Sequence, residues 1–332
     1  MTLASTFEAL GIVVIGRNEG ERLQRCLASV AASGACVVYV DSGSTDGSAA
    51  LARAMGADVV ELDMRRPFTA AWARNTGWQR LLVIHPQSTR VHFLDGDCEV
   101  IPGWIDKAMQ LLDEREDIGI VCGRRRERYP AATAFNRQCE IEWNAPSGEI
   151  RSCGGDALMR IEALRATGGF RDGLIAGEEP ELCVRVRGAG WKVWRIASDM
   201  VWHDAAMTRW SQWWRRSMRA GHAYAEGAAI HGRLPERHYV RECRRALAWG
   251  VALPVAVIVA APFNPLALIL LAAYPLQMLR LALRPTKAAR DADAVWSRAF
   301  FLVAARFPEA AGVLLFNWRR LRGVDSTLIE YK

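Results

Sequence analysis

Short apolar runs alternate with polar, turn-rich segments through about the first two thirds of the chain. Runs of four or five apolar residues are typical of buried strands, and most are followed by a segment whose apolar residues recur with helical spacing. Strand, loop and helix repeated in this way predict an α/β domain with a mostly parallel sheet and helices on both faces. The predicted strands are 11–15, 36–40, 59–62, 91–94, 118–122 and 191–196, and the helices include 49–55, 69–82 and 105–112.

The pattern changes completely near the C-terminus, where no residue from Ala246 to Leu279 is charged. A single membrane-spanning helix needs about 20 residues, so this run is too long for one span. Pro262 and Pro265 divide it into two apolar halves, which fit two tight spans, a re-entrant hairpin, or a helical pair buried in a soluble core. Basic residues flank both ends of the run and predict that both ends lie on the cytoplasmic side, as in a hairpin. These residues are Arg241, Arg244 and Arg245 before it, and Arg280, Arg284, Lys287 and Arg290 after it.

Two further segments are apolar on one side and basic around it. Arg209–Arg219 places Trp210, Trp213 and Trp214 on one helical face with arginines beside them, which is typical of a helix at a membrane surface. Phe300–Trp318 is apolar but interrupted by charge, and we expect interfacial helices there as well. The predicted division is an α/β domain over 8–205, interfacial amphipathic helices over 206–245, a hydrophobic membrane hairpin over 246–283, and C-terminal interfacial helices and a tail over 284–332.

The composition of the chain indicates which classes of molecule it is expected to bind. The net charge is +7 and the chain has 13 Trp, several of them beside arginines, which favours anionic lipids or phosphorylated substrates. No nucleic-acid-binding module is recognisable, so nucleic acid is not an expected partner. The eight cysteines contain no C-x-x-C pair, which argues against a zinc site and for a reducing compartment. Met1–Leu10 lacks the features of a signal peptide, so we expect the α/β half to stay in the cytoplasm.

The strongest candidate chemistry follows the predicted strand 91–94. There Asp95 and Asp97 are separated by Gly96, and on an extended backbone both carboxylates would point to the same side. Two hard oxygen ligands suit Mg²⁺ or Mn²⁺ carrying a diphosphate, with Gly96 allowing close approach; the alternative is a solvated turn. Asp41 and Arg74 fall at or near the same sheet edge, outside the carboxyl ends of the strands, where open α/β sheets bind ligands.

Four motifs, in order and spacing, resemble family 2 glycosyltransferases, including bacterial enzymes of cell-surface and exopolysaccharide synthesis. They are Arg17-Asn18-Glu19, Val40 to Ser48, Ala73-Arg74-Asn75-x-Gly77, and Phe93 to Asp97. The resemblance covers about Leu10 to Asp204. It implies a GT-A fold, a UDP- or GDP-linked sugar donor, Mn²⁺ or Mg²⁺, and an inverting mechanism. One departure is Ser42, where many members carry a second Asp.

The resemblance also implies roles for individual residues. Gly177-Glu178-Glu179-Pro180-Glu181-Leu182 resembles the family's Gly-Glu-Asp-x-Glu-Leu segment, which makes Glu179 the catalytic base with one extra methylene. The alternative is an acidic first turn favoured by the helix dipole. His203 resembles a histidine that completes the metal shell, and the metal ligands would be Asp95, Asp97 and His203. The expected nucleotide-sugar-binding residues are Arg17, Glu19, Asp41, Arg74, Asp95, Gly96, Asp97 and Gly155.

These inferences predict a glycosyltransferase at the cytoplasmic face of a membrane, the bacterial inner membrane by the resemblance. The expected acceptor is a hydroxyl of a lipid-linked or cell-surface glycan. Two alternatives stay open: a polyprenyl-phosphate sugar synthase, whose phosphate acceptor needs no base, and a non-catalytic scaffold that binds nucleotide sugar. Asp156 is a candidate for a sugar hydroxyl or for a helix N-cap, and the basic run Gly123–Arg128 for a solvated strand end or an anion contact.

Overall fold

The computed structural model describes residues 9–284, 292–324 and 329. The chain forms two compact units. The first consists of Met1–Arg128 and Ala145–Asp204, and the second of Tyr129–Asn144 and Ala205–Lys332. The second unit therefore includes a short segment that the sequence division had assigned to the α/β domain.

The first unit is built on one mixed sheet in the order β3-β2-β1-β4-β8-β6-β9-β5, with β7 paired to β9. Its first four strands are parallel, as predicted, and β8 then joins antiparallel to both β4 and β6. β6 and β9 are parallel, while β5 and β7 run antiparallel to β9. The strands are β1 Leu10–Gly16, β2 Cys36–Asp41, β3 Asp58–Glu61, β4 Arg90–Asp95, β5 Cys98–Val100, β6 Ile118–Glu127, β7 Gly148–Glu149, β8 Ala157–Arg160 and β9 Lys192–His203.

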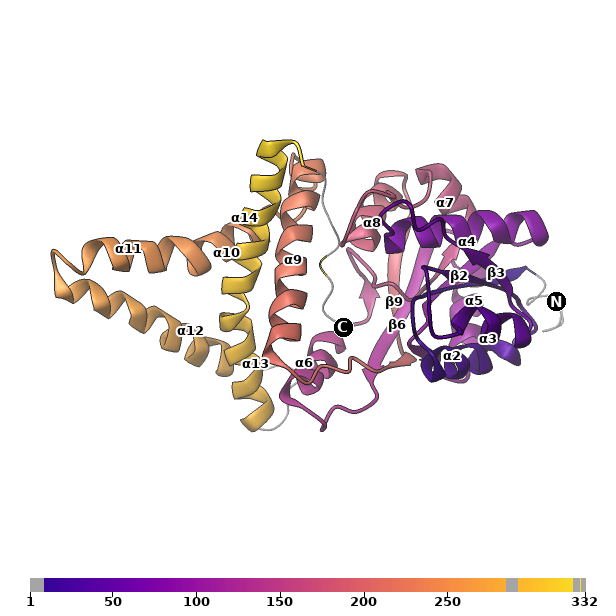
Figure 1. Ribbon diagram of the computed structural model, residues 1–332, viewed down its shortest axis with the longest axis horizontal. Coiled ribbons are helices and arrows are strands. Elements are labelled where there is room, and N and C mark those ends of the chain that lie inside the picture. Colours follow the sequence, from indigo (N-terminus) through magenta and orange to yellow (C-terminus); the bar gives the residue numbers. More distant parts are fainter. Residues whose placement is uncertain (1–8, 285–291, 325–328, 330–332) are drawn as a thin grey trace. The chain divides into compact units, whose positions relative to one another are not determined.

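Helices cover both faces of this sheet, with α4, α7 and α8 on one side and α2, α3 and α5 on the other (Figure 1). Strand β4 shows the two faces: the ring of His92 lies beside Trp104 of α5, while Phe93 packs edge-on against Phe170. Because both faces are covered, the central strands are continuous apolar runs rather than alternating ones. The helices are α2 Glu21–Ala31, α3 Ser48–Ala54, α4 Ala70–Ile84, α5 Trp104–Glu114, α7 Ile161–Thr167 and α8 Glu178–Gly188.

Strands β6 and β9 extend further than the apolar runs that predicted them. They pair in parallel through Glu127 and His203, with register shifts along the way. The residues added to β6 are Gly123 to Glu127, four of them charged, and those added to β9, Ala197 to His203, are of mixed polarity, so hydrophobic patterning did not identify them. The consequence is functional, since β5 then pairs with the end of β9 and sets Cys98 opposite His203.

The second unit consists of helices. Its longest, α9 (Trp210–His231), packs along α14 (Arg306–Arg322). Two glycines allow this packing, because a Cβ on Gly221 would overlap the carbonyl oxygen of Glu309, and one on Gly312 would overlap that of Met218. The other helices are α6 Ala134–Trp143, α10 Val240–Leu247, α11 Leu253–Ala260, α12 Ala273–Ala282 and α13 Ala292–Ala304, with a π-helical turn over Ala248–Ala252 and a 3₁₀ helix over Pro265–Ala272.

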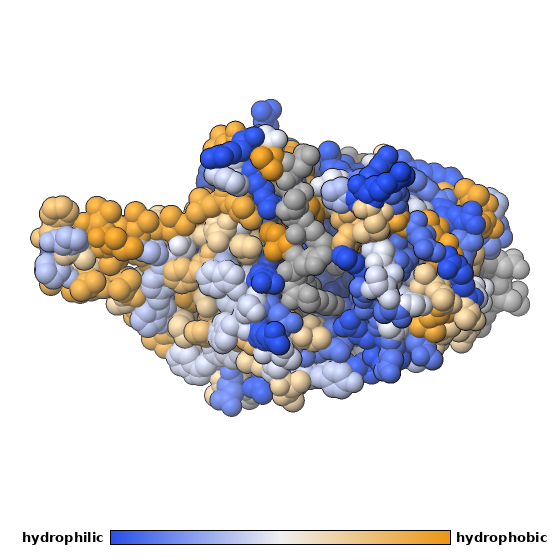
Figure 2. All heavy atoms as spheres, viewed as in Figure 1, coloured by the Kyte–Doolittle hydropathy of each residue, from blue (hydrophilic) through white to orange (hydrophobic). Residues whose placement is uncertain are grey.

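Two arms of this unit expose aliphatic side chains along their length. One arm is α10 with α11, the other is the 3₁₀ helix with α12, and together they form the apolar projection in Figure 2. Ile258, Phe263 and Ile269 are 71%, 88% and 67% exposed. Val240–Ala260 and Pro265–Ala282 are long and apolar enough to cross a membrane, and only 11% and 6% of their most apolar stretches are buried. This exposure argues against a helical pair buried in a soluble core, and it indicates membrane association.

Residues 292–322 form a third helical stretch that is long and apolar enough to cross a membrane, but half of its most apolar part is buried. The sequence had suggested helices at the membrane surface here. That interfacial placement stays a prediction, since length and composition also permit a span.

The exposed arms generate a testable prediction. Replacing both Ile258 and Ile269 by Lys should let carbonate extract the full chain from membranes, whereas the unaltered chain should resist extraction. The reason is that each Lys within the apolar layer costs about 2.5–3.5 kcal/mol. Val83→Lys is the matched control, because Val83 is 72% exposed on α4 of the first unit. Equal extraction of the double variant and the control would contradict an anchor in these arms.

Candidate functional site

The strand β4 ends at Asp95, and Gly96 and Asp97 form a tight turn into β5. Gly96 donates a backbone hydrogen bond to the Ile15 carbonyl oxygen (2.8 Å), and a Cβ on it would lie 3.4 Å from Glu19 Cγ. Gly96 therefore permits close approach to the end of β1. The extended backbone that the sequence predicted stops at Asp95, and the two carboxylates have different partners: Arg74 for Asp95 and His203 for Asp97.

Asp95 joins a cluster of three carboxylates around the guanidinium of Arg74. Arg74 is 2% exposed and lies on α4. Its Nη2 donates to Asp95 Oδ1 (2.8 Å), and its Nη1 donates to Glu178 Oε1 (2.9 Å) and lies 3.1 Å from Glu179 Oε1. The ring of Phe170 lies 5.7 Å from the guanidinium carbon. Since both amino groups face carboxylates, direct contact between Arg74 and a diphosphate stays a prediction.

Gly155 closes this cluster on another side. A Cβ placed on it would overlap Arg74 Nη2 and would lie 2.9 Å from Asp95 Oδ2 and 3.0 Å from Glu179 Oε1. The absent side chain thus keeps the carboxyl groups of Asp95 and Glu179 open to a common space. The sequence had named Gly155, Asp95 and Glu179 separately, and the structure brings all three together.

The electrostatics of the cluster set the protonation of Glu179. Burial, followed by the neighbouring charge of Glu178, raises the pKa of Glu179 to about 7, although Arg74 acts in the opposite direction. Burial alone would lower the pKa of Arg74, but the carboxylates of Glu179, Asp95 and Glu178 outweigh it and raise that pKa. A carboxyl group with a pKa near neutrality can accept a proton at physiological pH, which is a property of general bases.

Asp97 belongs to a second group of side chains, which includes His203 at the end of β9. The distance between Asp97 Oδ2 and His203 Nε2 is 3.4 Å, and the ligand atoms of Asp97, Cys98 and His203 all lie within 4.8 Å of one another. A carboxylate and an imidazole are a donor set that suits Mn²⁺, so these residues fit a divalent cation. Asp95 falls in a different group, with Cys98 and Asp156, and its role as a direct metal ligand stays a prediction.

Asp156 and Arg125 are site residues whose partners the sequence did not reveal. Asp156 is fully buried; it accepts a hydrogen bond from the Asp95 backbone nitrogen (2.9 Å) and pairs with Arg125 Nη2. Arg125 Nη2 also lies 3.7 Å from Asp95 Oδ2. Asp156 therefore supports the end of β4, rather than capping a helix. The basic run that contains Arg125 was the available signal, since one of its side chains points into the site.

The remaining predicted residues lie around the β1 and β2 ends. Asp41 is 2% exposed; its Oδ1 accepts from the backbone nitrogens of Gly43 (2.9 Å) and Ser44 (2.7 Å), and its Oδ2 from the Tyr39 hydroxyl (3.0 Å). Asp41 therefore shapes the turn after β2. Arg17 is exposed, with its guanidinium over the Phe68 ring, and Glu19 pairs with Arg22 at 2.8 Å.

Asn75 was part of a sequence motif but had no assigned role. Its side-chain nitrogen donates to the Phe170 carbonyl (2.7 Å) and to Asp172 Oδ1 (2.6 Å), and its oxygen accepts from the Phe170 nitrogen (2.9 Å). These bonds tie the loop before α8 to α4. Asn75 therefore positions the segment that leads to Glu179.

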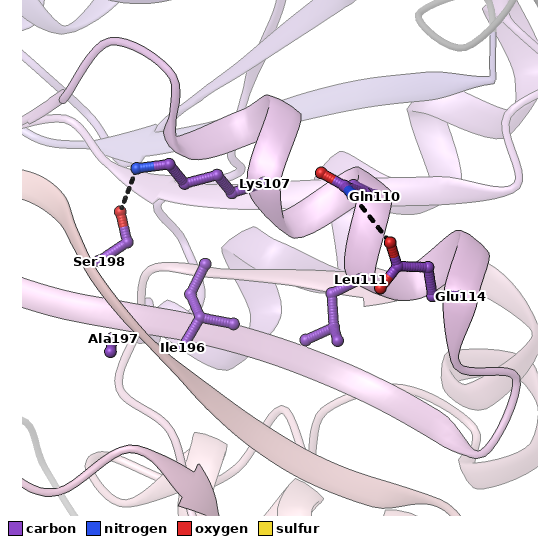
Figure 3. Close-up of a pocket in the computed structure, with 7 residues that line it drawn as sticks. All are labelled: Lys107, Gln110, Leu111, Glu114, Ile196, Ala197 and Ser198. Atoms are coloured by element: carbon purple, nitrogen blue, oxygen red, sulfur yellow. Dashed lines mark hydrogen bonds between the residues drawn. The ribbon is translucent and has the colours of Figure 1, made fainter.

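A separate hollow lies between α5 and the first half of β9 (Figure 3). Lys107 donates to the Ser198 hydroxyl (3.4 Å), and Gln110 donates to Glu114 Oε1 (2.8 Å). Its volume is about 340 Å³, but none of the residues of the carboxylate cluster lines it. We assign the chemistry to the cluster and not to this hollow.

The mixed sheet, the acidic turn after β4 and the carboxylates at the start of α8 define a GT-A glycosyltransferase. Residues 11–172 match the family described as glycosyl transferase family 2, so this part of the chain is a domain of that family.

Known proteins with recognisable similarity agree with this assignment. Glycosyltransferase AglE of Haloferax volcanii is 24% identical over 212 residues, which cover 60% of this chain and 67% of that protein. The succinoglycan biosynthesis protein ExoA of Rhizobium meliloti is 26% identical over 217 residues, which cover 59% and 63%. The alignments thus span about two thirds of these relatives.

Among solved structures, the fold resembles that of the mannosyltransferase PcManGT from Pyrobaculum calidifontis. The TM-score is 0.63 at 19% identity, over 94% of this chain and 88% of that one. At this identity the similarity establishes the fold, and residue roles have to be argued from this chain's own site.

The cluster predicts how stability responds to loss of Arg74. Arg74→Met should destabilise the protein by about 3–5 kcal/mol at neutral pH, because it leaves buried carboxylates without their cation. Glu179, whose pKa is raised to about 7, takes up a proton in the folded state as the pH falls, so the deficit should shrink about two pH units lower. Thermal unfolding of the full chain in detergent at both pH values measures this.

Arg80→Met is the matched control on the same helix. Arg80 pairs with Asp58 at 2.7 Å, but their side chains are 41% and 28% exposed, and such surface pairs contribute about 0–1 kcal/mol. Equal losses of stability in the two variants would argue against the buried cluster. So would a loss of stability in Arg74→Met that grows as the pH falls.

Proposed function

We propose that this protein transfers a sugar from a UDP- or GDP-linked donor to a hydroxyl of a lipid-linked or cell-surface glycan, with inversion at the anomeric carbon. The observation that carries the proposal is the convergence of Glu179, Asp95 and Gly155 around Arg74. The names of two similar proteins support the classes of donor and product: the mannosyltransferase is described with GDP-Man and Mn²⁺, and ExoA acts in succinoglycan biosynthesis.

Glu179 acts as the general base in this proposal. It takes the proton of the acceptor hydroxyl as the oxygen attacks the anomeric carbon, and the pKa of about 7 lets it do so at neutral pH. Arg74 holds the carboxylate in place and limits the rise of that pKa. Asn75 keeps the loop before α8 against α4 and so fixes where the base lies.

The donor would lie along the carboxyl ends of β1, β2 and β4. Asp97 and His203 would hold Mn²⁺ or Mg²⁺, with Asp95 beside them and toward the ribose. When bound, the cation supplies positive charge for the departing diphosphate. Asp41 would contact the nucleoside from its turn. Arg17, Glu19, Gly96 and Gly155 would line the donor, and Arg125 lies close enough to Asp95 to contribute a further positive group.

The acceptor and the side of the membrane follow from the C-terminal half. Arginines flank both ends of the uncharged run 246–279, and positive charge is retained on the cytoplasmic side. We infer that residues 8–205 transfer the sugar at the cytoplasmic face, the inner membrane of a bacterium by the family resemblance. An acceptor carried on a lipid would then reach the enzyme within the same membrane.

A polyprenyl-phosphate sugar synthase is the second candidate, favoured by the exposed apolar arms. Its phosphate acceptor is already ionised, so it would need no base. The third candidate, a scaffold that only binds nucleotide sugar, is disfavoured by the buried carboxylate cluster, and an assay for donor hydrolysis distinguishes it.

Glu179→Gln should lower turnover by about 10²–10⁴-fold, because it keeps the size of the side chain but removes the proton acceptor. Donor affinity should stay within a few fold. The pH dependence should change as well. The unaltered enzyme should lose about tenfold in rate for each pH unit below about 7, as Glu179 becomes protonated, and the variant should lack this dependence.

Glu178→Gln and Glu181→Gln are matched controls in the same helical turn. Glu178 pairs with Arg74, whereas Glu181 pairs with Arg171 and Arg185. Equal loss of turnover in all three variants would make Glu179 structural. Loss in Glu178→Gln alone would move the base by one residue, and full turnover in Glu179→Gln would favour the phosphate acceptor.

Asp97→Asn should weaken binding of UDP or GDP in the presence of Mn²⁺ at least tenfold, which corresponds to about 1.4 kcal/mol. The reason is the loss of a charged ligand opposite His203. Isothermal titration with and without chelator measures the effect. Unchanged affinity in the variant, or full affinity of the unaltered chain in chelator, would refute the metal site.

A further inference from the structure

A small hollow in the second unit is lined by residues of both apolar arms, of α13 and of the start of α14. Its volume is about 20 Å³, which is enough for about one water-sized polar group. A nucleotide or a sugar ring does not fit in it. Its lining includes Arg245, Trp249, Gln277, Leu281, Leu302 and Arg306.

The two arginines make the hollow positively charged. Arg306 pairs with Glu309 (Nη1 to Oε2, 2.8 Å) and donates from Nε to the Leu302 carbonyl (3.1 Å). Arg245 has no hydrogen bond or ion pair among the residues that the structure describes. A guanidinium beside a second guanidinium is stabilised when an anion lies between them, and phosphate oxygens suit its planar donors.

Two carboxylates, Glu242 and Glu309, act on Arg245 electrostatically, but the cations Arg306 and Arg241 act on it more strongly in the opposite direction. No Asp or Glu occurs between Glu242 and Asp291, whereas this stretch contains Arg244, Arg245, Arg280, Arg284, Lys287 and Arg290. Glu309 is already paired with Arg306. An anion from outside the chain would balance the excess positive charge.

The surface next to the hollow is apolar. Trp249, Leu281 and Leu302 line it beside the arginines, and the adjoining arms expose aliphatic residues such as Ile258 and Leu276, at 71% and 63%. A water-soluble phosphate would gain nothing from this surface. An amphiphile would bury its chains against the arms while its head reaches the arginines.

We propose that this hollow binds the phosphate of an anionic membrane phospholipid, with Arg245 and Arg306 as the charged donors, Gln277 as a neutral donor, and the acyl chains along α11 and α12. One phosphate oxygen enters the hollow and the rest of the head stays outside. This lipid site is independent of the sugar-transfer reaction. The proposal is the same whether the acceptor is lipid-linked or soluble.

The test uses the full chain in a neutral detergent, with phosphatidylglycerol as the probe and native mass spectrometry to count the bound lipid. Arg245→Gln should weaken retention about tenfold, since one charge-assisted hydrogen bond is lost. Arg245→Lys should retain part of the binding. Arg244→Gln is the matched control, because Arg244 and Arg245 are both exposed on the same helix and only Arg245 lines the hollow. Phosphatidylcholine, inorganic phosphate and a polyprenyl phosphate are the comparison ligands.

Selective loss in Arg245→Gln, with retention in Arg244→Gln and no displacement by inorganic phosphate, supports the site. Equal loss in the two variants would overturn it in favour of diffuse surface charge. Displacement of phosphatidylglycerol by an equal amount of polyprenyl phosphate would overturn the choice of lipid and identify the hollow as a site for the acceptor's head. Unchanged turnover of Arg245→Gln on a soluble acceptor would show that the loss of lipid binding does not come from damage to the sugar-transfer site.

Discussion

The structure of the site depends on one buried guanidinium. Arg74 holds Asp95, Glu178 and Glu179 within ion-pair distance although they come from two elements far apart in sequence. Burying several carboxylates together would cost many kilocalories per mole without a cation. The single arginine offsets only part of that cost, which is why the pKa of Glu179 stays raised to about 7. The excess of buried carboxylates over cations therefore lowers the stability of the fold, and it also gives Glu179 a pKa at which it can accept a proton.

The positions of the other functional groups follow from strand pairing. Asp156 holds the backbone of Asp95, and the pairing of β5 with β9 sets Cys98 opposite His203 and brings Asp97 near it. Each contact comes from the antiparallel part of the mixed sheet, while the parallel part carries Asp41 and the β1 loop. Asp95 and Asp97 flank the turn at Gly96 and have separate partners, Arg74 and His203. That separation assigns Asp97 and Asp95 different tasks.

The second unit adds a different physical requirement. Its arms expose aliphatic side chains that water would disfavour, and its charged residues gather at the ends of those arms. The apolar arms need a bilayer around them. The arginines at the ends of the arms then lie at the level of the lipid phosphates. Close helix contacts at Gly221 and Gly312 hold α9 against α14 without large side chains between them. Membrane attachment and phosphate recognition therefore arise from one pattern of residues.

The amino-acid sequence by itself determined the α/β class, the first four strands, the uncharged C-terminal run and the family, because these depend on local hydrophobic periodicity and on short motifs. It also singled out Asp95, Glu179 and Gly155. Only the tertiary structure decided which of these meet. Asp95 meets Arg74 while Asp97 meets His203, β9 continues to His203, and Asp156 and Arg125 join the site, all through pairings between residues distant in the chain. Periodicity reports which face of an element is buried, but it does not report the partner that covers that face, and ion pairs between distant elements have no local signature.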